Sequence, residues 1–112
     1  VGHIGVANHE AISAAKAAVA GLVRGAAATY AASRIRVNAV SPGFMVTPAT
    51  ASLVASDAAR EGFSRQYPLG GIGTPEDVAQ AIAWLLSPAA ARITGQVVPV
   101  DGGFTAVRPL VR

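Results

Sequence analysis

Cysteine is absent from the sequence, and charged and aromatic residues are scarce. Of the 112 residues none is cysteine, 13% are charged and 5% are aromatic, whereas 52% are hydrophobic. The lack of cysteine excludes disulfides and thiolate metal sites, and we expect no metal centre and a cytoplasmic location. A chain this apolar and this weakly charged is not disordered, so it predicts one folded domain.

The basic residues do not form a patch. The net charge is +3, but the arginines are scattered from Arg24 to Arg112 with no basic run and no aromatic platform between them. We therefore expect no nucleic-acid partner. The longest apolar stretch covers residues 11–30, yet Lys16 and Arg24 interrupt it. We expect no membrane span.

An alanine-rich helix over residues 9–32 is the longest predicted element. Asn8 is a residue type that caps helix N-termini. Apolar residues surround the helix, which predicts burial on more than one face. A stripe of small residues at helical spacing would let another backbone approach, either within one subunit or between two. It consists of Ala14, Ala17, Gly21, Gly25 and Ala28.

A strand, a helix and a second strand are predicted after the long helix. Residues 35–40 alternate β-branched residues and predict a strand. Residues 44–67 have no strong period and predict a mobile segment with one or two short helices. The sequence Thr74-Pro75-Glu76-Asp77 is typical of a helix start, and that helix should end near Ser87. Residues 96–100 predict the last strand.

Several motifs, in this order and spacing, resemble the C-terminal half of the short-chain dehydrogenase/reductase family. They are Ala14-Ala15-Lys16-Ala17-Ala18-Val19, Ile35 to Gly43 followed by Thr47-Pro48, Pro68-Leu69-Gly70, Gly73 to Ala79, Thr94-Gly95-Gln96 and Asp101-Gly102-Gly103. The resemblance implies an α/β fold, the C-terminal portion of a Rossmann-like doubly wound parallel sheet. Residues 1–112 would then form a single partial domain without the N-terminal dinucleotide-binding half.

The resemblance also implies a cofactor, NAD or NADP, and residues that hold it. In the family the helix lysine, here Lys16, hydrogen-bonds the nicotinamide ribose. The threonine hydroxyl at Thr47 bonds the carboxamide, and a strand-ending Pro-Gly lets the backbone approach the ring. The implied cofactor-binding residues are Lys16, Pro42, Gly43, Phe44, Val46 and Thr47.

The catalytic tyrosine of the family is missing. It normally lies four residues before the lysine, where this chain has Ile12, which cannot transfer a proton. Some enoyl reductases of the superfamily place their tyrosine seven residues before the lysine, and this chain has His9 there. Histidine titrates near neutral pH, so His9 is a candidate acid alongside Lys16; the alternative is a first-turn residue without chemistry.

Two functions are compatible with these residues. The first is an NAD(P)-dependent oxidoreductase that acts on a small alcohol or carbonyl and forms a homodimer or homotetramer. In that case we expect the 112 residues by themselves to be inactive. The second is a non-catalytic binding or oligomerisation module derived from the same fold, which the substitution at Ile12 favours.

Overall fold

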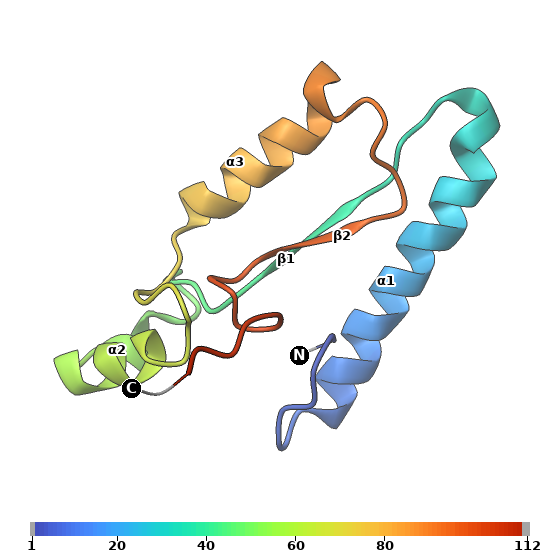
Figure 1. Cartoon of the computed structure of the whole chain (residues 1–112). Helices are drawn as coiled ribbons and strands as arrows, with labels where there is room; N and C mark the ends of the chain where they lie inside the picture. Colours follow the sequence, from blue (N-terminus) through green and yellow to red (C-terminus); the bar gives the residue numbers. More distant parts are fainter. Residues whose placement is uncertain (1, 111–112) are drawn as a thin grey trace. The chain divides into compact units, whose positions relative to one another are not determined.

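The computed structural model describes residues 2–110, and its elements follow the predicted order (Figure 1). They are α1 (Glu10–Tyr30), η1 (Ala31–Ser33), β1 (Ala39–Pro42), η2 (Ala51–Val54), α2 (Asp57–Ser64), α3 (Pro75–Leu86), η3 (Pro88–Ala90) and β2 (Val97–Val100). The chain divides into two compact units. We call residues 2–39 and 85–98 the helix unit, and residues 40–84 and 99–110 the pocket unit, and we describe each by itself.

The strands β1 and β2 pair with each other and run parallel. The Ala39 N–H donates to the Gln96 carbonyl at 2.9 Å, and the Gly43 N–H donates to the Val100 carbonyl at 3.0 Å. Partner numbers therefore rise together along both strands, which is the parallel pattern. A helix joins parallel strands in a βαβ unit, as predicted.

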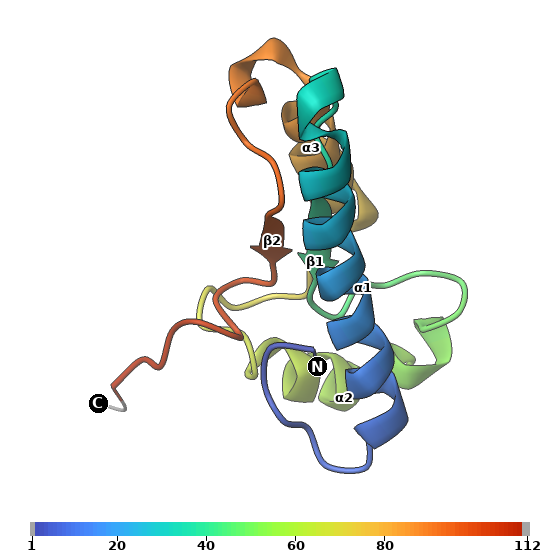
Figure 2. The same ribbon diagram turned by 90° about the vertical axis from the view of Figure 1, so that its right-hand side faces the viewer.

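In the helix unit, the opening residues turn back beside α1 (Figure 2). A Cβ atom at Gly2 would lie 2.8 Å from the Lys16 Cβ, so only glycine fits there without movement. The prediction that Asn8 caps the helix is wrong. Asn8 has a φ of 61°, and His9 is the residue that precedes the first turn, without a side-chain cap. The left-handed turn at Asn8 directs the chain into the helix instead.

The long helix is less buried than its composition predicts. Only Val23 and Ala27 of α1 are buried, while Ile12 is 49% and Leu22 70% exposed. The expectation of burial on more than one face is not met within residues 2–110, because the two buried residues lie one turn apart on one side of α1. By length and composition, residues 10–33 would suffice to cross a membrane, with a mean hydropathy of 1.3.

The strand predicted over residues 35–40 begins later, at Ala39. Residues 36–38 hold the segment 93–96 mostly through side chains, together with one backbone bond from the Gly95 N–H to the Val37 carbonyl at 2.7 Å. The Arg36 guanidinium donates to the Leu85 carbonyl at 2.7 Å and to the Ile93 carbonyl at 3.2 Å. The Asn38 amide bonds the Ile93 carbonyl and the Gln96 N–H. These bonds satisfy the backbone before the two strands meet.

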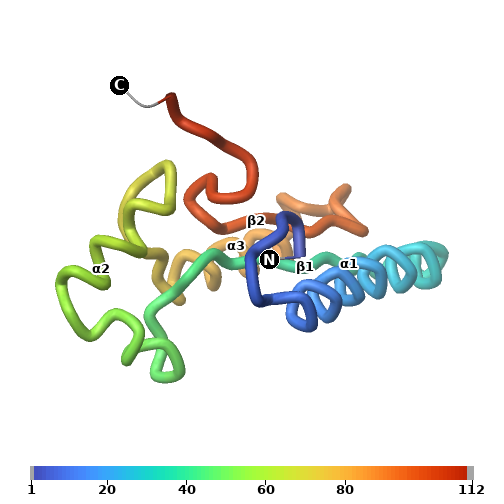
Figure 3. The backbone as a smooth tube through the Cα atoms, turned by 90° about the horizontal axis from the view of Figure 1, so that it is seen from below, coloured from blue at the N-terminus to red at the C-terminus, as the bar shows by residue number. Residues whose placement is uncertain are grey.

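In the pocket unit, the predicted irregular segment contains the two short helices η2 and α2, as expected. Figure 3 shows the chain after α2 returning beside the segment that follows β2, and the Leu69 N–H donates to the Gly102 carbonyl at 3.1 Å. The predicted start of α3 is confirmed. The Thr74 N–H donates to the Asp77 carboxylate at 2.8 Å, and the Asp77 N–H donates back to the Thr74 hydroxyl at 3.4 Å.

Candidate functional site

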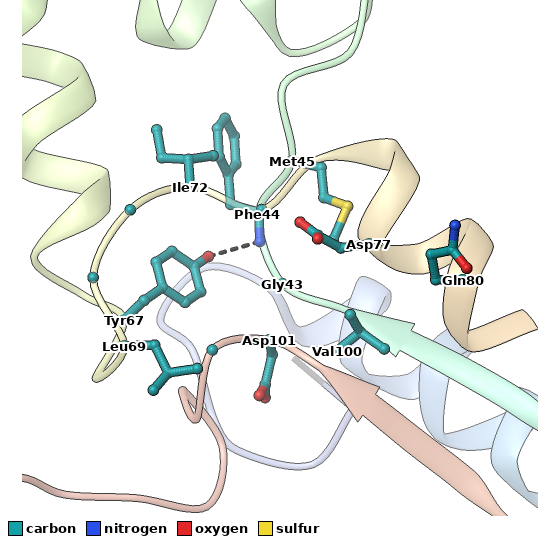
Figure 4. A pocket seen from close by; sticks show the side chains of 14 residues that line it. Gly43, Phe44, Met45, Tyr67, Leu69, Ile72, Asp77, Gln80, Val100 and Asp101 are labelled. Atoms are coloured by element: carbon teal, nitrogen blue, oxygen red, sulfur yellow. Dashed lines mark hydrogen bonds between the residues drawn. The ribbon is translucent and has the colours of Figure 1, made fainter. Parts of the chain in front are cut away.

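A pocket of about 450 Å³ lies at the carboxyl end of β1, within the pocket unit (Figure 4). Its walls come from the turn after β1, the chain after α2, the first turns of α3 and the turn after β2. The lining residues are Gly43, Phe44, Met45, Tyr67, Leu69, Gly70, Gly71, Ile72, Gly73, Asp77, Gln80, Val100, Asp101 and Gly102. Parallel α/β sheets bind ligands at this end of their strands, so the pocket is the best candidate site.

The turn after β1 is closely packed against Tyr67. The Tyr67 hydroxyl accepts a hydrogen bond of 2.7 Å from the Phe44 N–H. A Cβ atom at Gly43 would lie 2.9 Å from the ring carbon Cε1 of Tyr67 and 3.1 Å from the Cα of Asp101. Glycine is thus required at position 43 by its own neighbours, Tyr67 and Asp101.

The next turn is held by a threonine pair. The Thr50 hydroxyl donates to the Met45 carbonyl at 2.6 Å and accepts the Thr47 N–H at 2.9 Å. The two hydroxyl oxygens lie 3.1 Å apart. Because the Thr50 hydrogen is engaged with Met45, the Thr47 hydroxyl serves as the donor to Thr50. The Thr47 oxygen keeps free lone pairs and can accept a hydrogen bond from a ligand amide.

Asp101 organises the turn after β2. Its carboxylate accepts bonds from the Gly103 N–H at 3.0 Å, from the Thr105 N–H at 3.1 Å and from the Thr105 hydroxyl at 2.6 Å. Partial burial raises the pKa of Asp101, but the hydrogen bonds from Thr105 and Gly103 outweigh it, and the net pKa is lowered. Asp101 is therefore an anion that builds the pocket rim, and its acceptor capacity is largely used.

Asp77 also lines the pocket, and its carboxylate caps the first turn of α3. The backbone N–H and the hydroxyl of Thr74 both donate to its carboxylate, and these bonds lower the pKa of Asp77. Neither pocket carboxylate has the raised pKa of a proton-donating acid.

The segment between the turn and α3 contributes aromatic contacts. The rings of Phe44 and Phe63 stack with centroids 4.2 Å apart, and Phe63 belongs to α2. The ring centroids of Tyr67 and Phe104 lie 5.4 Å apart. Val46 lies outside the first pocket and lines a second, more open one with Arg60 and Ser64. An aromatic contact thus joins α2 to the turn after β1.

Lys16, Ile12 and His9 belong to the helix unit. Lys16 and Ile12 are exposed on α1, one turn apart. The His9 Nδ1 lies 2.7 Å from the Ala7 carbonyl oxygen. A carbonyl can only accept, so this bond places a hydrogen on Nδ1, and neutral His9 then presents Nε2 as an acceptor.

Within the pocket unit, the structure brings several predicted site residues close together in the chain turn after β1. Gly43 and Phe44 line the first pocket, Thr47 sits beside it in the threonine pair, and Val46 lines the second pocket. Pro42 ends β1. Sequence reasoning missed Met45, Thr50 and the bond to Tyr67. The short Thr-x-x-Thr spacing was a possible signal for Thr50, whereas nothing local could pair residues 44 and 67.

Comparison with known proteins identifies relatives of this chain. A family model described as enoyl-(acyl carrier protein) reductase matches residues 1–105. Cis-4-hydroxycyclohexanecarboxylate dehydrogenase of Sinomonas cyclohexanicum is 51% identical over 107 residues, which are 96% of this chain and 42% of that protein. Inactive 2-(S)-hydroxypropyl-CoM dehydrogenase 2 of Xanthobacter autotrophicus is 46% identical, over 95% of this chain and 48% of that protein.

A solved structure gives the same result. The crystal structure of a putative 2-deoxy-D-gluconate 3-dehydrogenase from Agrobacterium tumefaciens with bound NADP superposes with a TM-score of 0.77 at 40% identity, covering 84% of this chain and 38% of that one. The chain spans less than half the length of these relatives. Its α/β architecture is that of a Rossmann-type dehydrogenase, and the chain belongs to the short-chain dehydrogenase/reductase family.

Proposed function

We propose that the protein carrying this chain is an NAD(P)-dependent oxidoreductase that interconverts a small secondary alcohol and its ketone. The observation that supports this most is the turn after β1, where Gly43, Phe44 and Met45 line a pocket at the carboxyl end of a parallel strand. The relative with 51% identity is named for a secondary alcohol on a six-membered ring, which makes ring alcohols the first substrates to test.

The residues of the pocket unit fit the nicotinamide end of the cofactor. The Thr47 oxygen has lone pairs for the carboxamide, and the threonine pair fixes its direction. Pro42, Gly43, Phe44 and Val46 would line the ring and its surroundings, with Lys16 bonding the ribose. When bound, the dinucleotide supplies or accepts the hydride.

The chain's own residues would then handle the proton. Ile12 offers no acid or base, so we propose His9 for this role. With Nδ1 donating to the Ala7 carbonyl, Nε2 of neutral His9 can take the proton of an alcohol, and the imidazolium can return it to a carbonyl. The Lys16 ammonium would bond the ribose and, as a nearby cation, would favour removal of the alcohol proton.

Cofactor titration tests the proposal directly. In the natural protein, NADPH or NADH fluorescence should change on binding, and Thr47→Val should weaken binding by about 3- to 10-fold because one hydrogen bond is lost. Thr29→Val is the matched control, since the Thr29 hydroxyl on α1 only donates to the Gly25 carbonyl. If neither dinucleotide binds the natural protein, the proposed function is wrong.

We also propose that the protein assembles as a homodimer or homotetramer in the cytoplasm through α1. A Cβ atom at Gly21 or Gly25 would meet nothing within 4 Å, so both positions are open along the stripe of small residues. Leucine at both positions should reduce the sedimentation coefficient of the assembled protein if this face is covered by a second copy. An unchanged coefficient would exclude the stripe as the interface.

The second candidate is a module without catalysis. Ile12 supports it, and so does the existence of a relative named inactive at 46% identity. We further propose that the 112 residues by themselves do not turn over a dinucleotide, because they contain neither the family tyrosine nor a glycine loop between a strand and a helix. Steady oxidation of NADH or NADPH by the purified 112-residue polypeptide would contradict this.

A further inference from the structure

Tyr67 contacts both turns that border the pocket. Its hydroxyl accepts the Phe44 N–H at 2.7 Å, as the dashed line in Figure 4 marks, and its ring carbon Cε1 lies where a side chain at Gly43 would have to sit. Its Cβ lies 3.4 Å from the position of a Cβ on Gly102, in the turn after β2. One side chain therefore spans the ends of both strands.

The bond to Phe44 occurs where the ladder of β1 ends. The last bond between the two strands is donated by the Gly43 N–H to the Val100 carbonyl, and the next N–H along the chain, that of Phe44, faces away from β2. Tyr67 gives it an acceptor from a segment 23 residues away in sequence. An unpaired N–H at this position would be free to reorient, and the turn would lose a fixed direction.

Tyr67 lies shortly after α2, which ends at Ser64. Its N–H donates to the Ser64 carbonyl at the end of α2 at 3.2 Å, and its carbonyl accepts the Gly70 N–H at 2.8 Å. Phe63 of the same helix stacks on Phe44. Two contacts from the α2 segment thus converge on Phe44, one on its backbone and one on its side chain.

We infer that Tyr67 is a positioning residue that holds the Gly43–Phe44 turn in its cofactor-binding conformation and connects that turn to the α2 segment. This inference rests on the proposed function, because it assigns the turn to the nicotinamide end of a dinucleotide. The hydroxyl acts through the backbone of Phe44, so its loss should affect cofactor binding more than the chemical step.

Tyr67→Phe in the natural protein tests the inference, because it keeps the ring and removes only the acceptor. The dissociation constant for NADPH or NADH should rise by about 3- to 10-fold, with kcat changed less than 2-fold at saturating cofactor. Exchange of the Phe44 amide hydrogen with solvent should accelerate in the variant without cofactor. Tyr30→Phe is the control, since Tyr30 lies half-exposed on α1, and it should change neither quantity.

The outcomes separate the two proposals. Absence of dinucleotide binding in the unmodified protein overturns the proposed function, while faster Phe44 amide exchange in Tyr67→Phe would still support the structural part of the inference. Binding in the unmodified protein with an unaltered dissociation constant in Tyr67→Phe overturns the inference alone. An unchanged exchange rate at Phe44 overturns it as well.

Discussion

The two units of the chain differ in how completely their functional residues are supported. In the pocket unit, three polar groups at or near the pocket have partners: the Phe44 N–H bonds Tyr67, Thr47 bonds Thr50, and Asp101 bonds Thr105. In the helix unit, Ile12 and Lys16 are exposed on α1, and the His9 side chain bonds the Ala7 carbonyl two residues away.

That difference separates two tasks. On the proposed function, the turn after β1 would hold the nicotinamide ring, and the bond from Phe44 to Tyr67 fixes that turn from a segment 23 residues away. Moving a proton requires an acid or base of suitable pKa, and here the helix unit departs from its family at Ile12. On the proposed function, the pocket unit keeps the residues assigned to the cofactor, whereas the helix unit has Ile12 in place of the family tyrosine.

Restoring the family residue on α1 should give the largest effect. Ile12→Tyr in the natural protein places a phenol one turn before Lys16, and the ammonium should favour its ionised form. Carbonyl reduction, followed by NADPH or NADH absorbance, should increase by about 100- to 10,000-fold if acid-base help is what the helix unit lacks.

Ile12→Phe is the control for this change, because it adds the ring without the hydroxyl and should give no increase. A large loss in His9→Ala together with no gain in Ile12→Tyr would mean that His9 already supplies the proton. In that case the helix unit still has a working proton donor, although it lacks the family tyrosine.

Adding a side chain at Gly43, in the turn after β1, should cause the largest loss of stability in the pocket unit. Gly43→Ala puts a methyl group 2.9 Å from Tyr67 and 3.1 Å from the Asp101 backbone, and we expect a loss of about 1–3 kcal/mol in the free energy of unfolding, measured in urea. Gly62→Ala, inside α2 with no atom within 4 Å, should instead stabilise by about 0.5–1 kcal/mol. Equal effects at both glycines would argue against a tightly packed turn.

Removing the cap of α3 should have a moderate effect. Thr74→Ala deletes the hydroxyl that accepts the Asp77 N–H and donates to the Asp77 carboxylate, and we expect a loss of about 1 kcal/mol in the free energy of unfolding. Thr74→Ser retains the hydroxyl and should recover most of the loss. The same stability for the alanine and serine variants would show that the capping box contributes little.

The smallest expected effect is the pH dependence of Asp101. Its folded pKa is lowered from the ordinary value of 3.8, so its stabilising contribution is present above that value and is lost as pH falls through the folded pKa. The stability difference between the unmodified protein and Asp101→Asn, measured by urea unfolding, should therefore shrink as the pH falls below about 4. Thr105→Val removes one donor and should shift this loss to higher pH.

The fold was predictable wherever the signal is local. The start of α3 follows from Thr74 and Asp77, and its end before Ser87 follows from the next proline. The first strand was misplaced because its early residues, Arg36 and Asn38, bond the segment 93–96 through side chains. Alternation of β-branched residues carries no information about such partners.

Several residues of the candidate site could be predicted from the sequence, but the contacts that hold them in place could not. Gly43, Phe44 and Thr47 were found through their motif, and they lie in or beside the pocket. The bond from Phe44 to Tyr67 spans 23 residues, and no periodicity or local motif predicts a contact of that range.

By itself, the sequence determined the order of elements, the family and the loss of the tyrosine at Ile12, because each is a property of residue types at short spacings. Only the tertiary structure decided that Gly43 is required by Tyr67 and Asp101, that Thr50 directs Thr47, and that the apolar α1 is largely exposed in residues 2–110. Those facts depend on which distant segments meet, and burial and hydrogen-bond pairing exist only once they have met.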